Sequence, residues 1–229
     1  MKTVSLAAVL FCMAGAASAA GVTIGNGTGT TIISPFGSPN TQTFGEVFTP
    51  TVSGELTSFT LSLNAGVGSL YGGVGTWNGG PNFVVGAGSP VNLYTSANVA
   101  STGAQSFTFS PDVAVTEGVQ YVAYLSVYGD EDADAIAAMP SFLGADNAVT
   151  GINYFVYNDY EGGTSGEPAG NPTWNYSSFD HGTAQFSFTV SNSGSGTLPE
   201  PSTWAMLLLG FAGLGYARHR KVRSAASIA

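Results

Sequence analysis

The chain of 229 residues has little charge, and almost none of it is positive. Charged residues make up 8% of the sequence, whereas an ordinary globular domain has about 25%. All five lysines and arginines lie near the ends, so the span from Ala20 to Leu198 has thirteen acids and no Lys or Arg. A span without cations has nothing with which to neutralise phosphates and release their counterions, which excludes nucleic-acid binding. Divalent cations are left as the natural neutralisers of its acids.

Residues with reactive side chains are also scarce. The one cysteine, Cys12, lies within the first twenty residues, so the rest of the chain has no thiolate and forms no disulfide. His181 is the only histidine before the C-terminal segment, and the motifs Gly-x-Ser-x-Gly and His-Glu-x-x-His do not occur. We therefore predict that the protein is not an enzyme.

What the sequence does have is glycine, hydroxyl residues and short alternating runs. The 32 glycines disfavour long helices. Apolar residues alternate most clearly in Leu56–Leu63, while Val119–Tyr128 is apolar on both faces and suits a central strand. Further strands are expected at Thr30–Ile33, Thr43–Phe48, Ser69–Trp77, Val91–Thr95, Ser106–Phe109, Gly151–Tyr157 and Ala184–Val190, with one short helix in Asp132–Met139. The spacing predicts an all-β ectodomain over residues 20–190, an antiparallel and jelly-roll-like β-sandwich.

The two ends of this domain have different compositions. Residues 1–19 combine Lys2, an apolar run and the small residues Ala17-Ser18-Ala19, which is the pattern of a secretory signal peptide. Residues 191–197 are all Gly, Ser, Thr or Asn and are predicted to be a flexible linker. We therefore expect an exported domain that a short coil connects to the C-terminal segment.

The C-terminal segment, residues 198–223, combines three features in order. Pro199-Glu200-Pro201 and Trp204 come first, an uncharged Leu/Gly-rich stretch runs to Ala217, and a cationic cluster follows. The cluster contains Arg218, Arg220, Lys221 and Arg223. A transmembrane helix over the uncharged stretch would be about 21 Å long, shorter than a hydrocarbon core of about 30 Å. The cations resist crossing a bilayer and would hold its end in the cytoplasm.

This order of features resembles a PEP-CTERM sorting signal in its PEPxxWA form. The resemblance covers Pro199–Arg223 and implies an exported bacterial envelope protein. It also implies a partner, an exosortase-type membrane enzyme that cuts near Pro199-Glu200-Pro201. The protein would first be a membrane-anchored intermediate and then reach the cell surface or extracellular polymer.

An acidic cluster is the one candidate metal site. Asp130, Asp132 and Asp134 alternate, so an extended loop would bring their oxygens together on Ca²⁺. The EF-hand positions that require Gly and Glu are occupied by Ala135 and Ser141, so the loop is not an EF-hand. The cluster also fits a solvated loop that caps a short helix, and we favour that interpretation. No other cofactor is expected.

Aromatic residues in turns and polar stretches are candidates for stacking on sugar rings. They are Trp77, Trp174 and Tyr176. Packing of these rings onto the sandwich is the alternative, and it is favoured. The sequence thus predicts a surface or matrix protein associated with envelope or exopolysaccharide. The alternatives are a carbohydrate-binding module and, third, a secreted glycan-processing enzyme.

Overall fold

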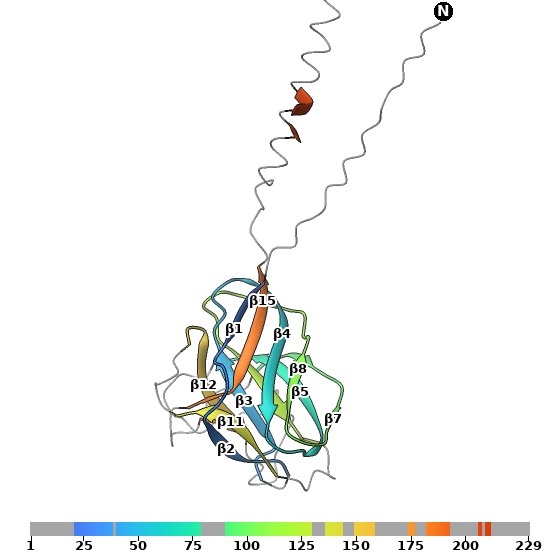
Figure 1. Ribbon diagram of the computed structural model, residues 1–229, viewed down its shortest axis with the longest axis vertical. Coiled ribbons are helices and arrows are strands. Elements are labelled where there is room, and N and C mark those ends of the chain that lie inside the picture. Colours follow the sequence, from blue (N-terminus) through green and yellow to red (C-terminus); the bar gives the residue numbers. More distant parts are fainter. Residues whose placement is uncertain are drawn as a thin grey trace, which may run out of the picture. The chain divides into compact units, whose positions relative to one another are not determined.

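Figure 1 shows a computed structural model of the chain. It describes residues 21–38, 40–78, 90–129, 136–143, 149–158, 174–176, 182–192, 206–207 and 209–211. The chain divides into two compact units, residues 1–193 and 194–229. We call residues 21–192 the β-domain.

The described part of the β-domain consists of strands and connecting loops. The strands are β1 (Val22–Gly25), β2 (Thr31–Phe36), β3 (Thr43–Phe48), β4 (Gly54–Leu63), β5 (Gly68–Thr76), β6 (Asn92–Thr95), β7 (Val99–Ser101), β8 (Gln105–Phe109), β9 (Val113–Val115), β10 (Tyr121–Ser126), β11 (Ala137–Phe142), β12 (Ile152–Asn158), β13 (Trp174–Tyr176), β14 (Thr183–Ala184) and β15 (Phe186–Asn192). The all-β prediction is therefore confirmed.

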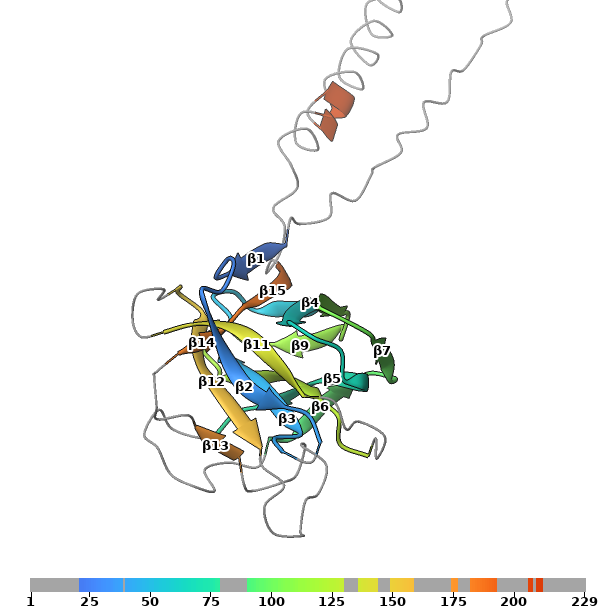
Figure 2. The ribbon, with the colours of Figure 1, turned by 60° about the horizontal axis from the view of Figure 1, so that its bottom comes forward.

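These strands form three sheets. One sheet has the order β1-β15-β4-β8, with β9 also paired to β4, and the first three of these strands run side by side in Figure 1. The largest has the order β13-β12-β3-β10-β5-β6, with β7 also paired to β5, and the third has the order β14-β11-β2. Figure 2 shows β15 and β4 above, and β12, β3 and β5 below. Every strand pair in the described residues is antiparallel, as the sequence predicted.

The main core lies between the two larger sheets. The ring of Phe48 in β3 lies 4.7 Å from that of Phe188 and 5.6 Å from that of Phe186, both in β15, measured between ring centroids. The third sheet contributes Phe36, whose ring lies 5.1 Å from that of Phe44. Such contacts between aromatic rings add to the burial of apolar surface that stabilises the fold.

Two strands match their sequence patterns closely. Phe59, Leu61 and Leu63 of β4 are buried in the main core, as the alternation predicted. β10 is buried along its whole length because β3 and β5 flank it and residues cover both of its faces. The prediction of a central strand at this position is confirmed.

Three sequence predictions need correction. Residues 137–139 belong to strand β11 and not to a helix, because Met139 pairs with β2 and is fully buried. Residues 22–25, where the sequence predicted no strand, form β1 because the neighbouring β15 supplies hydrogen-bonding partners. Strand β15 continues through Ser191 and Asn192, which the sequence assigned to the linker, because they pair with Glu55 and Gly54.

Candidate functional site

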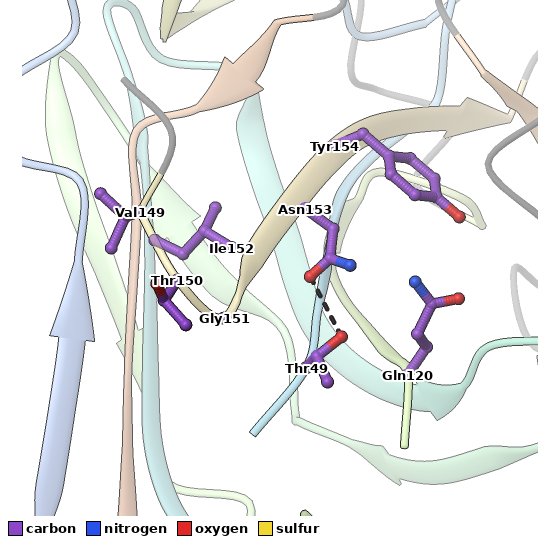
Figure 3. Close-up of a pocket in the computed structure, with 8 residues that line it drawn as sticks. All are labelled: Thr49, Gln120, Val149, Thr150, Gly151, Ile152, Asn153 and Tyr154. Atoms are coloured by element: carbon purple, nitrogen blue, oxygen red, sulfur yellow. Dashed lines mark hydrogen bonds between the residues drawn. The ribbon is translucent and has the colours of Figure 1, made fainter. Parts of the chain in front are cut away.

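An open pocket lies at one end of three neighbouring strands of the largest sheet. It has a volume of about 470 Å³. Thr49 follows the end of β3, Gln120 precedes β10, and residues 149–154 lead into β12. The lining residues are Thr49, Gln120, Val149, Thr150, Gly151, Ile152, Asn153 and Tyr154 (Figure 3).

The backbone around this pocket is fixed by hydrogen bonds. The amide of Thr49 donates to the carbonyl of Gly151 at 2.8 Å, and the amide of Ile152 donates to that of Val149 at 3.0 Å. Gly151 has a φ of 97°, a conformation that side chains with a Cβ rarely adopt. A tight, glycine-dependent turn therefore leads the chain into β12.

A β-bulge at Asn153 gives the pocket its main polar group. The register of β12 on β3 passes from Ile152 opposite Phe48 to Tyr154 opposite Val47, so Asn153 is the extra residue. A bulge redirects the side chain of the inserted residue. The hydroxyl of Thr49 donates to Asn153 Oδ1 at 3.1 Å, and the Gln120 carboxamide points toward the same space (Figure 3).

An aromatic cluster lies on the outer face of the same sheet, next to this pocket. It contains Trp77, Tyr124, Tyr154 and Trp174, packed with Val47, Val122 and Val156. The Trp77 indole Nε1 donates to the Tyr154 hydroxyl at 2.7 Å. The Trp77 and Trp174 rings meet edge to face at 5.9 Å between centroids. Tyr154 thus belongs both to the cluster and to the pocket lining.

Two of the three candidates for sugar stacking are buried in the aromatic cluster. Trp77 is 7% exposed and Trp174 is 1% exposed, so neither presents a ring face to solvent. The sequence pattern placed them in a turn and a polar stretch, but both rings are large enough to cover the outer face of the sheet. Tyr176 pairs with Val156 through strand β13, and its side chain lies outside the description. The sequence left sugar stacking and packing as alternatives, and the two tryptophans pack onto the sheet.

A buried acid is the residue that sequence reasoning missed. Glu46 lies in β3 between Phe44 and Phe48, faces the main core and is 0% exposed. Its Oε2 accepts a hydrogen bond from the amide of Ala184 at 2.8 Å, while Oε1 has no partner among the residues that the structure describes. Burial raises the pKa of the Glu46 carboxyl well above its usual value, and the Ala184 hydrogen bond opposes this only in part. The sequence did offer a signal for this buried acid, because Glu46 occupies a position in β3 at which the alternation places side chains toward the core.

The predicted metal site lies outside the described residues. This applies to Asp130, Asp132 and Asp134. No cluster of three or more His, Cys, Asp or Glu side chains suited to a metal occurs in the part of the chain that the structure describes. Calcium binding at the acidic loop stays a prediction.

The C-terminal segment matches a known sorting motif. A family model described as the PEP-CTERM protein-sorting motif matches residues 197–221. The tail is a PEP-CTERM sorting motif. The PEP-CTERM match includes all the residues of the predicted motif, Pro199, Glu200, Pro201 and Trp204, and of the cationic cluster except Arg223. A PEP-CTERM motif marks an exported protein that an exosortase sorts at the membrane toward the cell surface.

Most of the PEP-CTERM segment lies outside the described residues. Residues 206–207 and 209–211 are helical, and Leu209 and Phe211 are strongly exposed within it. Among the described residues, no helix has the length and apolar character needed to cross a bilayer. No curated protein and no solved structure matches the chain.

Proposed function

We propose that this is a non-enzymatic protein of the cell surface or extracellular matrix whose β-domain associates with extracellular polysaccharide. The observation that carries the proposal is the sorting motif at residues 197–221, which begins shortly after β15 ends at Asn192. A sorting motif attached to a β-rich domain suits a protein whose work is done outside the cell. The scarcity of catalytic side chains in the sequence supports a binding or structural role.

The topology of the proposal follows from the two ends of the chain. Residues 1–19 would be a signal peptide that is removed on export. The apolar part of the tail would form a transmembrane helix, and its cationic cluster would stay in the cytoplasm. The protein would then be a membrane-anchored intermediate before it reaches the surface.

The proposal predicts a cut near Pro199-Glu200-Pro201. Prolines fix φ and bar a regular helix, so this site would be extended and accessible outside the bilayer. Mass spectrometry of surface protein from the native cells should find a new C-terminus close to Pro199. Replacing Pro199→Ala, Glu200→Ala and Pro201→Ala together should leave uncut protein in the membrane fraction. Surface protein that is intact through Ala229 would contradict the sorting proposal.

Association with polysaccharide is tested separately by sedimentation. Extracellular polysaccharide from the producing cells is mixed with the purified full chain in mild detergent and pelleted. We expect the chain to pellet with the polymer at physiological salt, since no lysine or arginine of the β-domain is involved and salt has little to screen. A chain that stays in the supernatant at every polymer concentration would refute the association.

A further inference from the structure

We infer that the pocket beside the Asn153 bulge binds a neutral glycan. This inference rests on the proposed association with polysaccharide, and it names the site and the class of sugar. It moves sugar recognition away from Trp77 and Trp174, which are buried, to the carboxamides of Gln120 and Asn153.

The pocket holds polar groups that make no hydrogen bond to the described residues of the β-domain. The Thr49 hydroxyl donates a hydrogen bond to Asn153 Oδ1. The Asn153 amide N–H groups have no hydrogen-bond partner among the described residues. The Gln120 side chain makes no hydrogen bond within that same part of the chain, and both residues are partly buried. A carboxamide donates through nitrogen and accepts through oxygen, as each hydroxyl of a sugar also does. Two such groups facing one space suit a pair of neighbouring sugar hydroxyls.

These groups are held in place by the fold. The bulge sets the direction of Asn153, the Gly151 turn fixes the backbone before it, and the Gln120 carbonyl accepts a hydrogen bond from the Trp77 amide at 2.9 Å. The Trp77 indole in turn fixes the hydroxyl of Tyr154 at the edge of the pocket. A site whose donors are positioned before binding loses less entropy when a ligand arrives.

The absence of charge selects the kind of sugar. No charged residue is among those that line the pocket, and no Lys or Arg occurs anywhere from Ala20 to Leu198. Carboxylated, sulfated or phosphorylated sugars are bound chiefly through Arg and Lys, and the excess of acids would repel them. Val149 is partly buried and adds apolar surface on which the C–H groups of a neutral sugar ring pack.

Titration calorimetry with the full chain in mild detergent tests the inference. The probes are oligosaccharides of dextran, mannan and galactan, with oligogalacturonate as the anionic comparison. Binding of at least one neutral probe is expected, and Asn153→Ala and Gln120→Ala should each weaken it about tenfold, since each removes hydrogen bonds in a partly buried site. Gln105→Ala is the matched control because Gln105 is an exposed amide in β8 of the other sheet, and it should bind as the unmodified chain does.

The outcomes separate this inference from the proposed function. Equal affinity in the unmodified chain and both pocket variants would overturn the site while leaving polysaccharide association intact. Sedimentation with native polymer but no binding of any neutral probe, or stronger binding of oligogalacturonate, would overturn the neutral-glycan assignment. Failure to sediment with native polymer at all would refute the proposed function itself.

Discussion

Glu46 shows how one residue connects two sheets of the β-domain. It lies opposite Ala123 and Phe155 in the neighbouring strands, yet its side chain reaches the backbone amide of Ala184 in β14. This amide would otherwise be a buried donor without a partner, which costs about 1–3 kcal/mol. Burial raises the pKa of the Glu46 carboxyl, and the span contains no Lys or Arg that could offset this by pairing with the ionised form.

The first residue-scale prediction concerns pH. The pKa of Glu46 is raised in the folded protein, so the folded state keeps a proton that the unfolded state has lost. The free energy of unfolding should therefore fall as pH rises from about 4.5 toward the folded pKa, by up to about 1.4 kcal/mol per pH unit. Glu46→Gln keeps an oxygen acceptor for Ala184 and removes the titration, so its stability should not show this fall.

Urea unfolding of the mature protein between pH 4 and pH 8 measures this effect. The advantage of Glu46→Gln over the unmodified protein should grow as pH rises above about 4.5 and level off above the folded pKa. Glu55→Gln is the control, because Glu55 is exposed in β4 and its replacement removes the same charge at the surface. Parallel stability curves for the Glu46 variant and the unmodified protein would show that the carboxyl is already ionised in the fold.

At the scale of elements, β5 is shaped by two adjacent glycines. A Cβ added to Gly72 would overlap the ring of Phe109 in the main core, and one added to Gly73 would overlap the ring of Tyr124 on the outer face. The strand thus lets an aromatic ring lie against its backbone on each side. This close approach is what glycine provides in a strand.

Gly73→Ala should destabilise the β-domain by about 1–3 kcal/mol, because the Tyr124 ring has to leave its position in the aromatic cluster. Thermal unfolding followed by tryptophan fluorescence measures the loss, since Trp77 and Trp174 belong to the same cluster. Gly103→Ala is the matched control, because nothing lies within 4 Å of a Cβ at that position. A Gly73 variant as stable as the Gly103 variant would mean that the sheet adjusts freely around the added methyl group.

The sequence predicted the long strands better than the short ones. β4 and β10 have clear patterns because one or both of their faces are buried along their full length. β1, β9 and β13 are three or four residues long and exist because a longer neighbour supplies their hydrogen bonds, which no local pattern records. β11 was not predicted because residues such as Ala137 have good helical propensity. Pairing with β2 holds them in an extended conformation.

The candidate site was predictable only in its chemistry. The lack of Lys and Arg argued against partners rich in phosphate, such as nucleic acids, and the residues that line the pocket are likewise uncharged. Its position depends on a bulge and on residues from β3, β10 and β12, which are far apart in the sequence. The sequence left two alternatives open for the tryptophans because their place in turns and polar stretches gives no information on which way the rings face, and the favoured one, packing, describes Trp77 and Trp174.

For the whole molecule, the excess of acids governs the response to ions. If Asp130, Asp132 and Asp134 form a site, saturating Ca²⁺ should raise the unfolding temperature, since a ligand that binds only the folded state stabilises it. Mg²⁺ at equal ionic strength should do less because it requires a stricter octahedral geometry. Asp132→Asn should reduce the calcium effect. Equal shifts with both ions would indicate general screening, and no shift with either would remove the site.

The pairing of the first and last strands has a mechanical consequence. β15 continues into the tail and is held between two neighbours, with Phe186–Asn192 along β4 and Val22–Gly25 along β1. The ladder hydrogen bonds run across the strands, so a pull along β15 loads many of them at once in shear instead of opening them one by one. In the proposed state, with the tail anchored and bound polymer dragged by flow, the strand that takes the force would thus be one of the best supported in the domain.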